Sequence, residues 1–303
     1  MTRTGSDVPL KGAFTALVTP FHEDGRIDLG ALERLAAWQI DSGIDGLVPC
    51  GTTGEGATLR PEEHTQVLDT VVKVAARRVP VIAGCGTNDT RTTIDGARRA
   101  QAAGADALLV VTPYYNKPNR SGMIAHFAAI AEAVPLLIIA YNVPGRTGQN
   151  VGAELILRLA EIPGIVGVKE AAGNLEQLAA IVAGRREGFA VLSGDDPLAM
   201  PAVVLGATGV ISVVSNEAPD LTAALMRAAL AGDLSEARRL HYRLLPLMQA
   251  NFIESNPVPV KTALALLGRC RDTVRSPLGP PEGGTRRRMA EVLRACGLLE
   301  HAR

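Results

Sequence analysis

The sequence predicts an α/β fold, a closed (β/α)8 or TIM barrel followed by a C-terminal helical extension. Short apolar runs alternate with longer helix-patterned stretches, and the centres of these runs lie about 20 to 34 residues apart. A spacing of that size holds one strand and one crossover helix, and eight such units close into a barrel. A doubly wound open sheet would alternate in the same way, but the chain has eight expected strands and no good dinucleotide-binding glycine motif.

The expected strands are almost wholly apolar, as parallel strands covered by helices on both faces should be. They are expected at Phe14–Thr19, Gly46–Pro49, Val81–Gly84, Leu108–Thr112, Leu136–Tyr141, Val166–Lys169, Val191–Ser193 and Val210–Val213.

Glycines mark the ends of three expected helices, and a strand begins a few residues after each glycine. Glycine suits the left-handed backbone position that follows a helix. The three cases are Leu29–Ser42 before Gly43, Thr90–Ala103 before Gly104, and Pro197–Leu205 before Gly206. The same helix-to-strand loop therefore recurs, which indicates repeated modules.

No further strand is expected after Asn216. Helices are expected instead, at Asp220–Ala231, at Leu234–Gln249, after Asn256-Pro257-Val258-Pro259, and near Arg286–Cys296. Asp233 and Glu236 have the spacing of a capping box at the start of the second helix. We expect residues 1–217 to form the barrel that carries the active site, and residues 218–303 to form a helical extension packed on it.

Composition excludes several classes of protein. The 303 residues include 31 basic and 31 acidic side chains, and 47% are apolar, so the chain can bury a large core. Zero net charge removes the electrostatic argument for binding nucleic acid or an anionic membrane. The polar start lacks a secretion signal, and the four scattered cysteines suggest no disulfide framework. We therefore expect a cytoplasmic protein; the sequence leaves open whether Cys50 and Cys85 are redox-sensitive.

In barrels of this kind the reactive groups lie at the carboxyl ends of the strands and in the loops that follow. The polar segments at those places are GTTGEG at 51–56, PYYNKP at 113–118, YNVPGRTG at 141–148, GVKE at 167–170 and SGDD at 193–196.

Lys169 is the most informative residue in these segments. The chain contains 26 arginines and only five lysines, and only Lys169 closes an apolar strand. Apolar surroundings favour the uncharged amine, which can attack a carbonyl and form a Schiff base. Arginine cannot do this. The alternative interpretation is a buried ion pair with Glu170 or another carboxylate of the barrel.

Other residues could complete a site around Lys169. Tyr141 ends the neighbouring strand, so its phenol could shuttle protons, although an interior tyrosine is more often structural. Thr52 and Thr53 could hold a small carboxylate through backbone N–H groups, although glycine-rich loops are common. Arg146 could clamp a second carboxylate, although a solvated loop arginine is the commoner case.

Metal and nucleotide sites receive little support. The five histidines show no metal-ligand spacing, and Asp195 and Asp196 have no third partner nearby. No Gly-Lys-Ser/Thr follows the glycine-rich loop at 51–56, so it is not a P-loop. We therefore expect no metal and no organic cofactor.

Taken together, these segments resemble the dihydrodipicolinate synthase family of pyruvate-dependent class I aldolases and lyases. The resemblance covers nearly the whole chain. It rests on GTTGEGATL at 51–59, PYYNKP at 113–118, YNVPGRTG at 141–148, GVKEA at 167–171, LSGDD at 192–196, GVISV at 209–213 and ESNPVPVK at 254–261.

The resemblance implies a lyase that condenses pyruvate with L-aspartate 4-semialdehyde in diaminopimelate and lysine biosynthesis. It implies that Lys169 forms an imine with pyruvate, that Tyr141 is the central acid and base, and that Thr53 and Tyr115 complete a hydroxyl relay. It further implies that Arg146 binds the semialdehyde carboxylate. The residues implied to hold pyruvate or to line the same pocket are Thr52, Thr53, Gly194, Asp195 and Ile211.

The resemblance also implies an assembly and a form of regulation. In the family, the residue that matches Tyr115 comes from the adjacent subunit, and a homotetramer of two dimers is usual. Ala57, His64, Asn88 and Tyr114 match an allosteric lysine pocket. Gly56, Pro61 and Thr92 depart from it. We therefore expect weak or absent inhibition by L-lysine.

Two alternatives remain open at this point. Another pyruvate-dependent aldolase, such as an N-acetylneuraminate lyase or a keto-deoxy sugar acid aldolase, would share Lys169, Tyr141 and the glycine-rich loop. Arg146 favours a short acid-bearing aldehyde over a sugar acid. A catalytically silent barrel that acts as a sensor or scaffold is the alternative from a different class.

Overall fold

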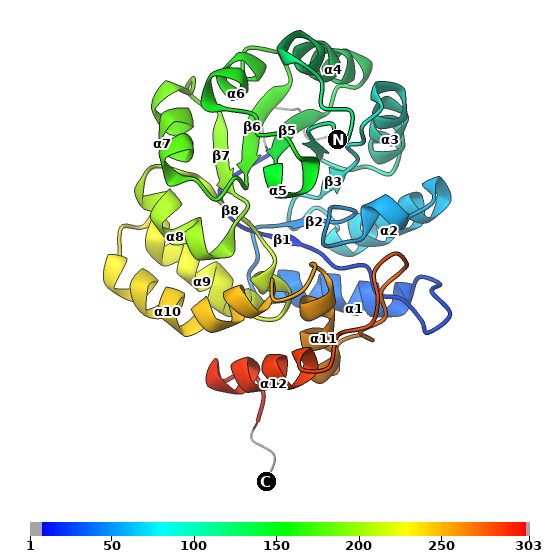
Figure 1. Cartoon of the computed structure of the whole chain (residues 1–303), viewed down its shortest axis with the longest axis vertical. Helices are drawn as coiled ribbons and strands as arrows, with labels where there is room; N and C mark the ends of the chain where they lie inside the picture. Colours follow the sequence, from blue (N-terminus) through cyan, green and yellow to red (C-terminus); the bar gives the residue numbers. More distant parts are fainter. Residues whose placement is uncertain (1–7, 301–303) are drawn as a thin grey trace.

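A computed structural model describes residues 8–300, and these residues form a parallel eight-stranded barrel surrounded by helices (Figure 1). The strands are β1 (Gly12–Ala16), β2 (Gly46–Val48), β3 (Ile82–Gly84), β4 (Ala107–Val111), β5 (Leu137–Asn142), β6 (Ile165–Glu170), β7 (Ala190–Ser193) and β8 (Gly209–Ser212). Their order is β2-β1-β8-β7-β6-β5-β4-β3. A parallel bridge between Leu47 and Val81 joins the two end strands. The predicted (β/α)8 fold is confirmed.

Helices cover the outside of the barrel and continue beyond it. They are α1 (Leu29–Asp41), α2 (Pro61–Ala75), α3 (Thr90–Ala102), α4 (Arg120–Ala133), α5 (Pro144–Thr147), α6 (Ala153–Leu159), α7 (Leu175–Gly184), α8 (Asp196–Val204), α9 (Pro219–Leu230), α10 (Leu234–Ala250), α11 (Val258–Leu266) and α12 (Thr285–Ala295). Two short 3-10 helices, η1 (Gly56–Thr58) and η2 (Val214–Asn216), follow β2 and β8.

Local sequence signals account for most boundaries. Gly43, Gly104 and Gly206 adopt φ values of 87°, 86° and 105°, so each occupies the left-handed position expected after its helix. Asp233 caps α10 by accepting a hydrogen bond from the backbone N–H of Glu236 at 3.0 Å. Only that half of the expected capping box forms, because the Glu236 carboxylate binds Arg239 instead.

The start of β1 differs from the expected range, since the strand begins two residues earlier, at Gly12. Gly12 has a φ of 105° and pairs with Gly209 of β8. A β-carbon on Gly12 would lie 2.1 Å from a carboxylate oxygen of Asp45, so only glycine fits there. A glycine at a strand end looks like a loop residue in the sequence. The short helix α5 was not expected either.

The core has two layers, as a barrel requires. One cluster fills the barrel interior and includes Phe14, Val48, Ile139, Leu192 and Ile211. A larger cluster lies between the strands and the surrounding helices. Tyr141 belongs to the interior cluster, so its ring is part of the barrel core as well as of the site described below.

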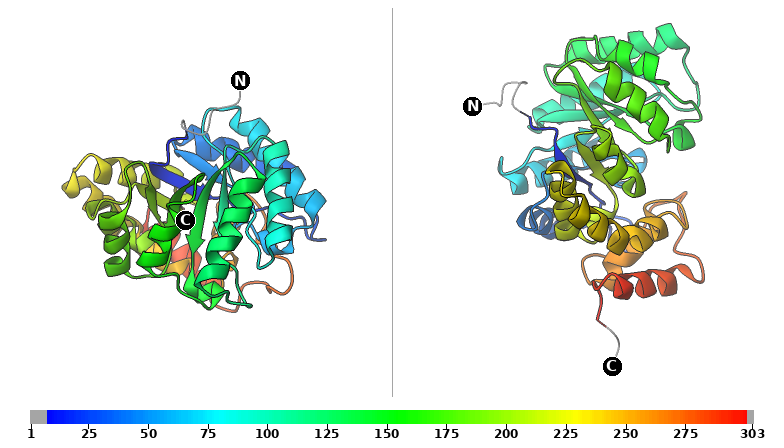
Figure 2. Two further views of the ribbon diagram at one scale, coloured as in Figure 1. Left: turned by 90° about the horizontal axis from the view of Figure 1, so that it is seen from above. Right: turned by 90° about the vertical axis from the view of Figure 1, so that its left-hand side faces the viewer.

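Helices α10, α11 and α12 lie at one end of the molecule, below the barrel in the view of Figure 1 and in the right-hand view of Figure 2. Helix α9 packs against β1 and α8, and α10 packs against both α8 and α9. The division of the chain at residue 217 stays a prediction, and α9 lies on the extension side of that division.

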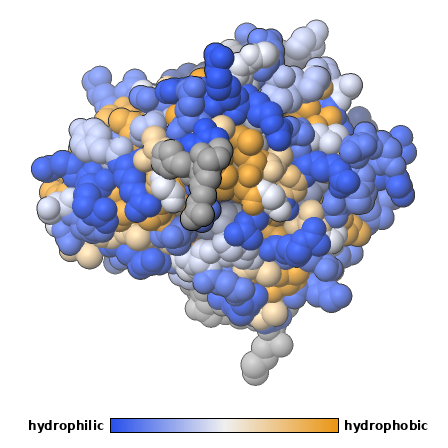
Figure 3. All heavy atoms as spheres, turned by 90° about the horizontal axis from the view of Figure 1, so that it is seen from below, coloured by the Kyte–Doolittle hydropathy of each residue, from blue (hydrophilic) through white to orange (hydrophobic). Residues whose placement is uncertain are grey.

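One face of the molecule is mainly hydrophilic, with hydrophobic residues gathered near its middle (Figure 3). No helix within residues 8–300 combines the length and the apolar composition needed to cross a membrane.

Candidate active site

Lys169 and Tyr141 lie side by side at the carboxyl end of the barrel. They are paired residues on β6 and β5, and the Lys169 ammonium lies 4.3 Å from the centroid of the Tyr141 ring. Lys169 is only 6% exposed. Gly194 gives the lysine its space, because a β-carbon at that position would lie 3.0 Å from Cε of Lys169. The structure thus brings together three of the predicted site residues.

Glu170 is not the partner of Lys169, so the ion-pair interpretation fails for this carboxylate. Successive residues of a strand point to opposite faces, and Glu170 points away from Lys169. The Glu170 carboxylate accepts hydrogen bonds from the side-chain amides of Asn142, at 3.0 and 3.1 Å, and Gln177, at 3.1 Å. It also accepts the backbone N–H of Ala172 at 2.8 Å. Burial raises the pKa of Glu170, and these hydrogen bonds act in the opposite direction.

The two adjacent aspartates near Lys169 are held by backbone groups. Asp196 accepts the N–H groups of Val213 and Val214, at 2.9 and 3.0 Å, and is fully enclosed at the start of α8. Asp195 accepts the N–H of Gly173 at 3.1 Å. Burial raises the pKa of both carboxyls, and the nearby positive charge of Lys169 lowers both. Neither forms a salt bridge with Lys169 within residues 8–300.

Asn256 connects the threonine loop to the arginine turn. Its side-chain amide donates to the hydroxyl of Thr53 at 3.0 Å. Its backbone carbonyl accepts a hydrogen bond from Arg146, on α5, at 3.3 Å. Thr53 and Asn256 are both buried, whereas Arg146 is exposed and Thr52 is half-buried. The extension therefore reaches into the mouth of the barrel. Asn256 lies in the 254–261 segment, where no local signal in the sequence points to this role.

Tyr115 stands apart from these groups. It is 88% exposed, has a left-handed φ of 70°, and forms no hydrogen bond or ring contact within residues 8–300. The relay of Thr53, Tyr141 and Tyr115 stays a prediction, since no hydrogen bond joins Tyr141 to either residue in the part of the chain that the structure describes. Ile211 is fully buried in the same interior cluster as Tyr141.

Other chemically reactive side chains are less suited to a site. Cys50 and Cys85 are buried, which raises the pKa of both thiols, that of Cys85 to about 12. The thiolate form that reacts with oxidants is therefore disfavoured at both. Within the described part of the chain, no group of three or more His, Cys, Asp or Glu side chains is arranged to hold a metal ion.

Comparison with known proteins agrees with this geometry. The model of the dihydrodipicolinate synthetase family matches residues 9–296. The chain is 50% identical over 290 residues to the 4-hydroxy-tetrahydrodipicolinate synthase of Maridesulfovibrio salexigens, and the match covers 95% of this chain and 99% of that protein. The enzyme of the same name from Neisseria meningitidis is also 50% identical over 290 residues, with 96% and 100% covered.

Solved structures give the same answer. The dihydrodipicolinate synthase from Acinetobacter baumannii, complexed with pyruvate, matches with a TM-score of 0.94 and 43% identity over 96% of this chain and 100% of that one. A monomeric dihydrodipicolinate synthase variant matches with a TM-score of 0.94 and 40% identity, over 95% and 97% of the two chains. The resemblance noted in the sequence is confirmed, and the chain belongs to the dihydrodipicolinate synthetase family.

Proposed function

We propose that this chain is a 4-hydroxy-tetrahydrodipicolinate synthase, a lyase that condenses pyruvate with L-aspartate 4-semialdehyde in lysine and diaminopimelate biosynthesis. The main support is the buried amine of Lys169, which lies beside Tyr141 and has no hydrogen bond or salt bridge within residues 8–300. An amine in that state is available for a covalent bond to a substrate.

The proposed reaction begins at Lys169. Its uncharged amine attacks C2 of pyruvate, and loss of water gives an imine. Loss of a proton from the methyl carbon then gives an enamine, because the imine accepts the electron pair. The enamine carbon attacks the aldehyde of the second substrate. The amino group of that substrate then attacks the imine carbon, which closes the ring and frees Lys169.

The remaining site residues take supporting roles in this proposal. The phenol of Tyr141 moves protons to and from the intermediates, with Thr53 and a Tyr115 supplied by a second subunit as its relay. Thr52 and Thr53 hold the pyruvate carboxylate, and Arg146 holds the carboxylate of the semialdehyde. Gly194, Asp195 and Ile211 line the pocket. The exposure of Tyr115 supports a role outside its own chain.

Because the imine itself accepts electrons, the proposed reaction needs no metal or organic cofactor. We place the enzyme in the cytoplasm, as a homotetramer of two dimers in which each dimer completes its own sites. The exposed Tyr115 supports the dimer.

Borohydride reduction in the presence of pyruvate tests the proposal directly. We expect a stable adduct on Lys169, identified by mass spectrometry of the digested protein. Parallel assays with aspartate semialdehyde and with sugar acids then test the second substrate. Preferential cleavage of a sugar acid would transfer the chain to another branch of the aldolases, and the absence of any adduct would favour a sensor.

A further inference from the structure

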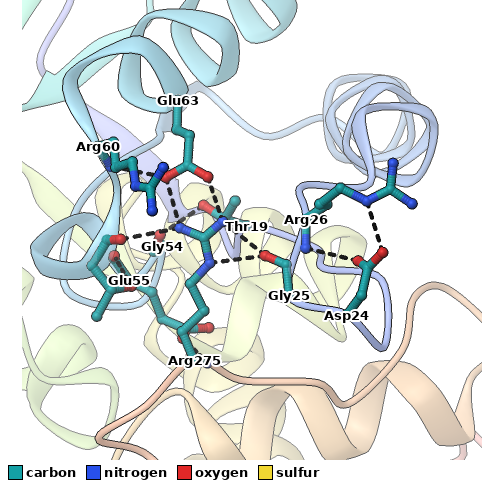
Figure 4. A network of polar contacts seen from close by, with 10 residues as sticks. Thr19, Asp24, Gly25, Arg26, Gly54, Glu55, Arg60, Glu63 and Arg275 are labelled. Carbon is teal, nitrogen blue, oxygen red and sulfur yellow. Dashed lines mark hydrogen bonds and ion pairs between the residues drawn. The ribbon is translucent and has the colours of Figure 1, made fainter.

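The loop that carries Thr52 and Thr53 is anchored by a carboxylate that the proposed reaction does not use. Glu55 lies two residues after Thr53, is 4% exposed, and has a left-handed φ of 52°. Its backbone N–H donates to the carbonyl of Thr52 at 3.1 Å. Thr19 adds a hydrogen bond to the carbonyl of Gly54 at 2.6 Å (Figure 4). The side chain of Glu55 leaves this turn and points toward the extension.

Lys261 of α11 meets that carboxylate. Its ammonium donates to Glu55 at 2.5 Å and to the carbonyl of Thr273 at 2.8 Å. It also lies 4.1 Å from the centroid of the Phe21 ring. Lys261 is 0% exposed, so both charges of the pair lie away from water.

Arg275, in the segment after α11, also contacts the Glu55 carboxylate. Its backbone N–H donates to the second carboxylate oxygen of Glu55 at 2.9 Å. Its guanidinium donates to both oxygens of Glu63, at 2.6 and 2.8 Å, and to the carbonyl of Gly25 (Figure 4). It also donates to the carbonyl of Thr58. Both oxygens of Glu55 are thus bound by residues of the extension, more than 200 positions away in the sequence.

Such a pair is a poor way to gain stability alone. Removing two charges from water is costly, and replacing a buried pair by apolar residues is often neutral or stabilising. A buried pair does, however, fix the direction of both partners, because each charge has few other places to go. Here the fixed element is the turn that presents Thr52 and Thr53.

We propose that Glu55 and Lys261 are positioning residues, which hold the Thr52–Thr53 loop in the geometry that binds the keto acid carboxylate. The inference rests on the proposed function of that loop. It makes the helical extension a working part of the active site, through Lys261 and Asn256, and not only a cover for the barrel.

The decisive variant is the double substitution Glu55→Gln with Lys261→Met. It removes both charges together, so no unpaired charge stays buried, and the glutamine can still accept the N–H of Arg275. We expect a folded protein whose amide hydrogens in residues 51–56 exchange at least about tenfold faster. We expect kcat/KM for pyruvate to fall about 10- to 100-fold, since small misplacements of binding groups have effects of that size.

Glu217→Gln is the matched control. It makes the same chemical change at another buried carboxyl, which Asn251 contacts at 3.3 Å between η2 and α10. We expect it to leave both the loop exchange and kcat/KM unchanged. A folded double variant with parental loop exchange, or with kcat/KM within about twofold of the parent, would overturn the positioning role. Failure of the parent protein to trap pyruvate would overturn the proposed function instead, and the exchange measurement would still decide whether the pair anchors the loop.

Discussion

Lys169 and Lys261 are both buried lysines with an aromatic ring beside the ammonium, yet their surroundings differ in one respect. The rings lie at 4.3 Å and 4.1 Å from the two nitrogens. Lys261 donates to a carboxylate and a carbonyl. Lys169 has no hydrogen bond or salt bridge within residues 8–300. A buried lysine that donates to a carboxylate is held in place as a structural cation, whereas a buried lysine with no hydrogen-bond partner is available for a covalent bond to a substrate.

The difference has a structural origin. Lys169 is the second-last residue of β6, and the neighbouring carboxylate of Asp195 is bound to the backbone N–H of Gly173. Lys261 lies on α11, and the surrounding residues bury it completely. Burial lowers the pKa of Lys261, and the negative charge of Glu55 raises it. The charged form of each partner is therefore stabilised by the other.

Lys169→Ala should have the largest effect on function. We expect kcat to fall about 10⁴-fold or more, because the variant has no amine to form the imine. Steady-state assays measure the loss, and borohydride with pyruvate should give no adduct. Tm should change little, since Lys169 makes no hydrogen bond or salt bridge within residues 8–300 that the variant would lose. Unfolding of this variant would contradict the contrast with Lys261.

Lys261→Ala should have the largest effect on stability. Removing one partner leaves the charge of Glu55 buried and unpaired, which costs about 3–5 kcal/mol of the free energy of unfolding. Urea denaturation at neutral pH measures the change. A loss below about 1 kcal/mol would mean that Glu55 takes up a proton or finds another partner.

Glu63→Gln tests the outer ion pair of the same network through pH. The hydrogen bonds from Arg275 lower the pKa of Glu63 from 4.5 to about 2. The unfolded chain therefore binds more protons in this range. The stabilisation is present above about pH 4.5 and is lost as the pH falls toward about 2. We expect the variant to lose about 1–2 kcal/mol near neutral pH and less near about pH 3, because the pair is partly exposed to solvent. An equal loss at both pH values would contradict this linkage.

Arg239→Met should have the smallest effect. Arg239 binds Glu236 in the same two-bond geometry, at 2.6 and 2.7 Å, but the pair lies on the exposed face of α10. We expect Tm to stay within about 1 °C of the parent, because water screens an exposed pair. A drop as large as that of Glu63→Gln would show that burial is not what separates the two arginines.

The two lysines also show how far sequence reasoning reaches. Lys169 could be predicted because the signal is local: a lysine at the end of an apolar strand, in a chain with 26 arginines and only five lysines. The barrel could be found because each unit repeats the same pattern. The ends of the strands are harder to predict from the sequence, because Gly12 looks like a loop residue until its partner Gly209 is known.

The role of Lys261 could not be found in this way. Its carboxylate partner lies 206 residues away, in a segment that we interpreted through its threonines. Asn256 joins Thr53 and Arg146 over separations of 203 and 110 residues. Such contacts depend on how the extension folds back over the barrel, and no local spacing encodes that path.

The contacts that Lys261 and Arg275 make with Glu55 can form only late in the synthesis of the chain. A ribosome delivers all eight strands, with Tyr141 and Lys169, before it delivers Lys261 and Arg275. A growing chain can therefore complete its barrel while the Glu55 carboxylate is still hydrated. The contacts of Glu55 with the extension therefore belong to the last stage of synthesis, and a chain cut before residue 258 would contain Tyr141 and Lys169 but would lack both residues that bind the Glu55 carboxylate.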